Sequence, residues 1–197
     1  VENRTVYSAE FAEMNIYETH KKANQVYLEF DCPIIASMIS GRKIMHLKNK
    51  ATFDFLPGES VVLPAKKKMI IDFPDATLDS PTRCMALGID SQKIQETIDV
   101  YQNATEIEES FTLGSNLNLS PLHLNNNTQV QHLLERLLQT FSSGHKSKDA
   151  LLDVMIKELI LRLLQTNARG ALLDKNSYLF DNHRMAFVLK YIREYYK

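Results

Sequence analysis

Tryptophan is absent from this sequence, and the 197 residues include only two cysteines, six glycines and six prolines. Disordered and collagen-like chains are rich in glycine or proline, so this scarcity excludes both classes. The charges almost cancel, with 23 basic against 24 acidic residues, which excludes a supercharged chain. What remains is an ordinary globular protein, long enough for one large domain or two small ones.

Long apolar runs are also missing. Four charged residues interrupt the most apolar stretch, residues 151–164, so no membrane span is expected. The first eleven residues lack the apolar segment of a signal peptide. Cys32 and Cys84 lie far apart inside apolar runs, which favours buried reduced thiols over a disulfide framework. Together these features predict a cytoplasmic protein.

Proline divides the chain, because all six prolines lie between Pro33 and Pro121. Proline interrupts helices, and none occurs in the last 76 residues, so the first half of the chain is expected to be β and the last third α. Short runs of β-branched and apolar residues, separated by turn residues, predict an antiparallel barrel or sandwich. The predicted strands are 25–31, 34–40, 43–48, 51–56, 60–63, 68–73 and 82–89.

From Asp90 onward the apolar period becomes that of a helix. Asp90 or Ser91 can cap the first helix, and the Asn125–Asn127 loop with Thr128 leads into the second. The apolar stripe of the third helix is wide enough to touch two surfaces. The predicted helices are 92–102, 128–141, 147–170 and 182–196.

Signs of catalysis are missing. The six histidines form no His-x-His or His-Glu-x-x-His pair, and no glycine-rich phosphate loop, nucleophile elbow or Cys-x-x-Cys occurs. We therefore predict no catalytic residue, no metal site and no cofactor. His46 is interpreted as an edge or surface histidine, with a ligand contact at a barrel mouth as the alternative. The run Lys66–Lys68 is interpreted as a solvated loop, with an anion site as the alternative.

The segment Pro57–Ala65 resembles the second cupin motif, with a turn, a strand and a second turn, and with Gly58 and Pro64 separated by five residues. Metal-binding cupins have a glycine and a histidine where this chain has Lys66 and Met69. The His-x-His of the first cupin motif is absent as well. Without these metal ligands, we expect none of the metal-dependent chemistry of cupin enzymes.

A second segment, residues 157–170 followed by residues 182–196, resembles the end of the regulatory domain of AraC-family transcriptional regulators. Arg184, Val188, Leu189, Tyr191, Ile192 and Arg193 fit the first helix of that family's DNA-binding domain. The resemblance implies an α+β fold: a cupin-like antiparallel β-barrel of jelly-roll type followed by a C-terminal helical hairpin. It implies a sensor barrel over residues 1–90, a helical dimerisation segment over 91–170, and over 171–197 a linker and the first helix of a truncated helix-turn-helix domain.

The implied function is that of a ligand-sensing and dimerisation domain of a bacterial regulator, not an enzyme. DNA binding is then expected only of a longer protein with two helix-turn-helix units. A metal-free cupin-like enzyme or a sugar-binding barrel with a helical appendage is the alternative. The length of the natural reading frame distinguishes the two, because an enzyme would end near Lys197.

The leucine-rich helices offer more apolar surface than one sheet face needs, and a homodimer through this helix pair is expected. A hairpin packed only on its own barrel is the alternative. The candidate interface residues are Leu133, Leu137, Leu138, Leu152, Met155 and Leu159.

An effector-sensing barrel needs a cavity lined by the inward-facing residues of alternate strands. Arg42, His46 and Lys48 are candidate polar anchors near its rim. The lining is apolar and lacks tryptophan, which favours a hydrophobic or weakly anionic small molecule over a carbohydrate. The alternative is that these side chains fill the barrel. The candidate ligand-binding residues are Met38, Ile44, His46, Phe53, Phe55, Met69, Ile71 and Phe73.

Overall fold

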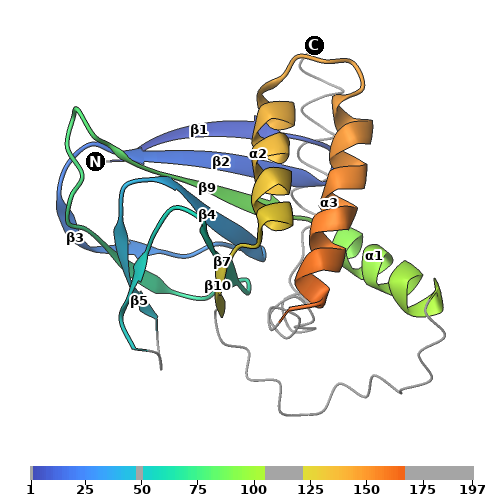
Figure 1. The fold of residues 1–197 in the computed structure, drawn as a ribbon, viewed down its shortest axis with the longest axis horizontal. Coiled ribbons are helices and arrows are strands. Elements are labelled where there is room, and N and C mark those ends of the chain that lie inside the picture. The colour runs from blue at the N-terminus through green and yellow to red at the C-terminus, as the bar shows by residue number, and fades with distance from the viewer. Residues whose placement is uncertain (1, 48–50, 105–121, 167–197) are drawn as a thin grey trace.

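The computed structural model describes residues 2–47, 51–104 and 122–166. Two antiparallel sheets form a barrel-like jelly roll, and three helices lie on one side of it (Figure 1). The predicted cupin-like α+β fold is therefore confirmed. The predicted helix 182–196 and the predicted domain segment 171–197 lie outside the described residues.

The larger sheet has six strands in the order β1-β2-β9-β4-β7-β10, and every neighbouring pair is antiparallel. Its strands are β1 (Glu2–Ser8), β2 (Ala12–Thr19), β9 (Thr82–Ile89), β4 (Ile34–Ser40), β7 (Glu59–Leu63) and β10 (Leu122–Asn125). The smaller sheet has the order β3-β8-β5-β6, with β3 (Ala23–Leu28), β8 (Met69–Phe73), β5 (Lys43–Leu47) and β6 (Phe53–Phe55).

Three strands of the larger sheet were not predicted. β1 and β2 form a hairpin at the start of the chain, and β10 returns after α1 to pair with β7. Ala12, Met14 and Ile16 alternate along β2 and are buried, which is the period-2 pattern of a strand with one buried face. The strand β10 lies within the segment predicted to be helical, so the barrel is completed from residues beyond position 90.

Glycine closes the turn between β4 and β5. Gly41 has φ +77°, and a Cβ at this position would lie 2.7 Å from the Thr82 hydroxyl and 2.9 Å from the Thr82 Cα. A side chain is therefore excluded by both backbone conformation and space. Gly58 also has a positive φ, +87°, but a Cβ there would meet nothing within 4 Å.

The barrel interior between the two sheets is a buried apolar cluster, and every strand from β4 to β9 contributes to it. Its side chains come from alternate positions, as pleated strands with one inward face require. Its buried members are Ile34, Met38, Met45, Leu47, Phe55, Val61, Leu63, Met69, Ile71, Phe73, Ala76, Cys84 and Ala86.

The helices are α1 (Ser91–Ala104), α2 (Thr128–Ser142) and α3 (Lys148–Leu164). Side-chain caps begin the first two. The Asp90 carboxylate accepts hydrogen bonds from the backbone N–H groups of Gln92 and Lys93, and the Asn127 side chain accepts from Val130 N–H. Both predicted cap regions are confirmed, with Asp90 as the acceptor at the first.

A second buried cluster joins the helices to the outer face of the larger sheet. In Figure 1, α2 lies in front of the sheet, with α3 beside it and α1 next to α3. The cluster takes Met14 and Ile16 from β2, Leu87 from β9 and the apolar stripes of the helices. The larger sheet is thus buried on both faces over its central strands. None of the helices in the described ranges is both long and apolar enough to cross a membrane.

Candidate functional site

Five of the predicted ligand-binding residues lie inside the barrel core. Their side chains are at most 5% exposed and pack in the cluster between the sheets; they are Met38, Phe55, Met69, Ile71 and Phe73. Phe53 is partly buried and packs against the same cluster. None of the six lines the cavity described below. Their binding role therefore stays a prediction.

The predicted orientation of β5 is wrong by one residue. Lys43, Met45 and Leu47 are buried toward the barrel, whereas Ile44 and His46 alternate with them and are half-buried on the other face. Both orientations of this strand place apolar residues inside, so alternation alone does not distinguish them. The prediction placed Ile44 and His46 inside, with Lys48 near the rim, but the structure buries Lys43 in the interior.

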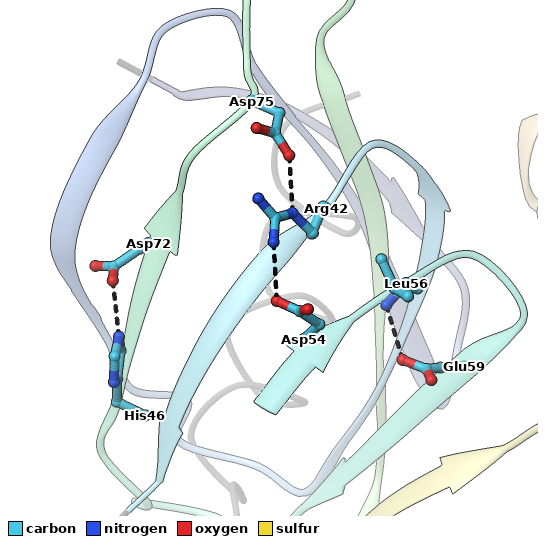
Figure 2. Close-up of polar contacts among 7 residues, drawn as sticks. All are labelled: Arg42, His46, Asp54, Leu56, Glu59, Asp72 and Asp75. Atoms are coloured by element: carbon cyan, nitrogen blue, oxygen red, sulfur yellow. Dashed lines mark hydrogen bonds and ion pairs between the residues drawn. The ribbon is translucent and has the colours of Figure 1, made fainter. Parts of the chain in front are cut away.

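The predicted anchors His46 and Arg42 contact residues of the smaller sheet and its adjoining turns (Figure 2). His46 Nε2 lies 2.8 Å from Asp72 Oδ2, and His46 Nδ1 lies 3.1 Å from Thr52 Oγ1. The pKa of Asp72 is lowered, first by the hydrogen bond from Gln25 N–H and then by His46. The half-exposed His46 side chain thus contacts Asp72 on β8 and Thr52 just before β6.

Arg42 bridges two carboxylates. Its Nε donates to Asp75 at 2.8 Å and its Nη1 to Asp54 at 3.2 Å (Figure 2). The hydrogen bond to Asp75 raises the pKa of Arg42 and lowers the pKa of Asp75. Lys48, the third predicted anchor, lies outside the described residues.

A cavity of about 300 Å³ opens where the β1–β2 hairpin, the segment between β3 and β4, and the end of β9 meet. Alternation on β2 turns Glu13, Asn15 and Tyr17 toward this cavity, while Met14 and Ile16 face the helices. Tyr17 and Phe30 meet edge to face, with centroids 6.4 Å apart and an interplanar angle of 74°. These two rings also pack against the barrel core, so the cavity adjoins the barrel interior.

One cation lies among the polar groups of this cavity. Arg4 Nε donates to Asn15 Oδ1 at 2.6 Å, and Arg4 Nη2 donates to Glu13 Oε1 at 3.0 Å. Asn15 is 6% exposed and donates in turn to Glu13 at 3.1 Å. Arg4 itself is half-exposed, so three of its five N–H donors remain beyond the two bonds named. Four further carboxylates line the cavity, from Glu10, Glu29, Asp31 and Asp90.

This combination can bind a molecule with an apolar body and a small polar group. The aromatic and aliphatic lining provides apolar contact, and the Arg4–Asn15–Glu13 cluster provides donors and acceptors. Within the described ranges, no three His, Cys, Asp or Glu side chains lie close enough together to hold a metal ion. The sequence prediction missed this site because it did not recognise β1 and β2 as strands.

The candidate interface residues are placed mainly in the core of a single chain. Leu133, Leu137, Leu152, Met155 and Leu159 are at most 4% exposed and hold α2 and α3 on the larger sheet. Leu138 is partly buried at the edge of the same cluster. The exposed apolar side chains of α3 are Leu151, at 48%, and Val154, at 64%.

Comparison with protein families gives one match over most of the chain. The family model described as the N-terminus of AraC-type transcriptional regulators matches residues 10–171. No curated protein sequence matches the chain.

Among solved structures, the chain is similar to ToxT from Vibrio cholerae. An apo single-residue variant from strain SCE256 shares 12% identity with a TM-score of 0.59. ToxT from strain O395 bound to (E)-4-(8-methylnaphthalen-1-yl)but-3-enoic acid shares 16% identity, and wild-type ToxT from strain SCE256 bound to an unsaturated fatty acid shares 14%, each with a TM-score of 0.56. The matches cover 93% of this chain and 65%, 72% and 69% of those three chains, so this chain spans less than two thirds of the first.

Proposed function

This chain belongs to the family of AraC-type transcriptional regulators, whose N-terminal model matches residues 10–171, and we propose that it is the ligand-sensing and dimerising part of such a regulator. The observation that carries the sensing role is the cavity beside Arg4 at the end of the barrel. DNA contact belongs to the rest of the regulator, acting in a bacterial cytoplasm, and the chain performs no catalysis of its own.

The effector we propose is a hydrophobic molecule with one carboxylate. Phe11, Tyr17, Phe30 and other apolar side chains provide the contact surface, and the Arg4 guanidinium provides charge-assisted donors for one carboxylate. The surrounding carboxylates repel a molecule with several negative charges. ToxT, a protein of similar fold, has been crystallised with an unsaturated fatty acid and with an aromatic butenoic acid, which supports this class.

A binding screen tests the proposal. The chain is titrated calorimetrically with medium- and long-chain fatty acids, with an aryl butenoic acid, with the corresponding alcohols and with simple sugars. We expect an acid to bind and the sugars not to bind. Binding of sugars alone, or binding of none of these compounds, would contradict the proposed effector class.

A matched pair of arginine variants tests the anchor. Arg4→Gln should weaken binding of the acid about 10-fold, equivalent to losing one charge-assisted contact, and should leave binding of the alcohol unchanged. Arg83→Gln is the control, because Arg83 also pairs with a glutamate, Glu18 at 2.6 Å, but does not line the cavity. Equal losses in both variants would argue against Arg4 as the anchor.

The dimerisation role is proposed for the helix pair. The side chains of the five predicted leucines and the one predicted methionine are largely buried within the chain. The contact with a second copy is therefore assigned to the exposed side of α3, at Leu151 and Val154. Sedimentation at increasing concentration should show a dimer that Val154→Glu dissociates without unfolding the chain. A wild-type monomer at all concentrations would contradict this assignment.

A further inference from the structure

Two reactive side chains meet inside the barrel. Lys43 on β5 and Cys84 on β9 belong to opposite sheets, and each is 3% exposed. The Lys43 Nζ lies 2.7 Å from the Cys84 Sγ and 5.0 Å from the centroid of the Phe73 ring. Among the residues that the structure describes, no carboxylate forms an ion pair with Lys43. A buried amine with a thiol as its polar partner is unusual, because buried amines normally pair with carboxylates.

The separation of the two atoms is short for a hydrogen bond. N–H···O contacts are about 2.7–3.2 Å long, and sulfur is a larger atom than oxygen, so an N–H···S contact should be longer still. At 2.7 Å the nitrogen and sulfur are too far apart for a direct N–S bond. A single oxygen atom bonded to both would span this distance without movement of either strand.

We propose that Lys43 and Cys84 are a redox-modification site, in which oxidation by hydrogen peroxide joins the lysine nitrogen to the cysteine sulfur through one oxygen atom. The two side chains react with two molecules of peroxide to give the N–O–S bridge and three molecules of water. One N–H and the S–H bond break, and an N–O and an O–S bond form. Four electrons pass to the two O–O bonds that are cleaved.

The reaction divides into steps that each balance. One peroxide oxidises the Cys84 thiol to a sulfenic acid and leaves as water. The second oxidises the Lys43 amine to a hydroxylamine and also leaves as water. Condensation of the two hydroxyl-bearing groups then releases the third water and closes the bridge. The short separation of Nζ and Sγ favours this intramolecular condensation over further oxidation of the sulfur.

The cavity provides a route for the oxidant. Cys84 is paired in register with Tyr17 across β9 and β2, and Tyr17 lines the cavity. Directly paired residues on neighbouring strands have Cβ atoms about 4.5–5.5 Å apart. A peroxide molecule that enters the cavity and contacts Tyr17 is therefore next to the residue that carries the thiol.

The bridge would tie the two sheets together through the core. β5 and β9 share no backbone pairing, since they belong to different sheets. A covalent link between them restricts the unfolded chain and should raise the melting temperature of the oxidised protein. This property does not depend on which effector the cavity binds.

Mass spectrometry of the peroxide-treated chain tests the proposal. The bridge adds one oxygen and removes two hydrogens, so the intact mass should rise by about 14 Da, whereas a sulfenic acid would add about 16 Da. Trypsin should release residues 43–48 joined to residues 84–93, with no cleavage after Lys43. Dithiothreitol should restore the original mass and both separate peptides.

Three variants make the test specific. Cys32→Ala should still form the bridge, because the other cysteine takes no part, whereas Lys43→Met and Cys84→Ala should not. Failure of the Cys32→Ala chain to gain about 14 Da, or persistence of this gain in Lys43→Met, would overturn the proposal. A linked peptide about 2 Da lighter than its two parts would also overturn it, since this mass indicates a direct N–S bond. Peptide mapping of the wild-type chain decides the question even where a variant fails to fold.

Discussion

At the scale of single residues, Gly41 is required by both its backbone conformation and its neighbour. Its φ of +77° costs an L side chain about 1–2 kcal/mol, and the Thr82 backbone and side chain occupy the space that a Cβ would need. The residue lies in the turn between β4 of the larger sheet and β5 of the smaller sheet. Its conformation therefore fixes how β4 leads into β5.

Gly41→Ala should consequently destabilise the fold more than Gly58→Ala. Both positions have a positive φ, but the space around Gly58 is open, so the comparison isolates the clash with Thr82. We expect the free energy of unfolding to fall by about 1–3 kcal/mol more at position 41, as measured by urea denaturation. Equal losses would show that the turn relaxes away from Thr82.

Lys43 shows where prediction from single residues stops. The run Lys43 to Leu47 alternates, but Ile44 and Met45 are both apolar, so either face could be inward. Lysine is almost never fully buried, so the residue type at position 43 does not indicate an inward side chain, and the prediction took the face of Ile44 and His46 instead. The buried amine gets its contacts from Cys84 on the opposite sheet and from Phe73 on the neighbouring strand β8, and both positions depend on the whole fold.

At the scale of elements, most strands and helices follow from local pattern. The predicted ranges 34–40 and 82–89 coincide with β4 and β9, and the helix at 128–141 matches α2 to one residue at its end. The hairpin of β1 and β2 was missed because its polar residues outnumber its apolar ones. Four of these polar residues line the cavity, so part of what obscured the strand pattern belongs to the proposed site; they are Arg4, Ser8, Glu13 and Asn15.

The stability of α3 on the sheet should depend on which face is substituted. Leu159 is fully buried and Leu151 is 48% exposed on the same helix. Leu159→Ala should reduce the free energy of unfolding by about 2–5 kcal/mol through the cavity it leaves. Leu151→Ala should change it by no more than about 0.5 kcal/mol. Chemical denaturation of the two variants checks this, and similar losses would contradict the described packing of α3.

An ion-pair network joins α1 to α3. Asp153 on α3 contacts Lys93 on α1 and lies 2.7 Å from Lys157, and Lys93 also lies over the Phe11 ring, 4.7 Å from its centroid. The pKa of Asp153 is lowered, first by the hydrogen bond from Lys157 and then by that from Lys93. The carboxylate therefore stabilises the fold in its charged form.

This network predicts a pH dependence. Because the folded pKa of Asp153 lies below its unfolded value, its contribution is complete above the unfolded pKa and is lost as the pH falls through the folded pKa. Asp153→Asn should be less stable than the wild type by about 1 kcal/mol at neutral pH, and the difference should vanish in acid. Urea melts across this range measure it. A difference that stays constant with pH would assign the effect to packing instead of charge.

At the scale of the whole molecule, one sheet serves two functions. The outer face of the larger sheet is covered by the helices, while its inner face closes the barrel and, at β1 and β2, borders the cavity. β2 therefore lies between the proposed effector and the proposed dimerisation helices. Asn15 and Tyr17 lie on the opposite face of β2 from Met14 and Ile16, which pack with those helices. Only the thickness of β2 therefore separates a change in the packing of Asn15 or Tyr17 from the helices.

The measurement that tests the location of the effector most directly is the affinity of one bound acid for two tryptophan variants. Leu28 lines the cavity and is half-buried, whereas Leu56 lies outside it in the turn before β7 and is 39% exposed. Leu28→Trp fills the cavity and should weaken binding at least about 10-fold, or about 1.4 kcal/mol, while Leu56→Trp leaves the affinity unchanged. An unaltered affinity in a folded Leu28→Trp chain would contradict the assignment of this cavity as the sensing site.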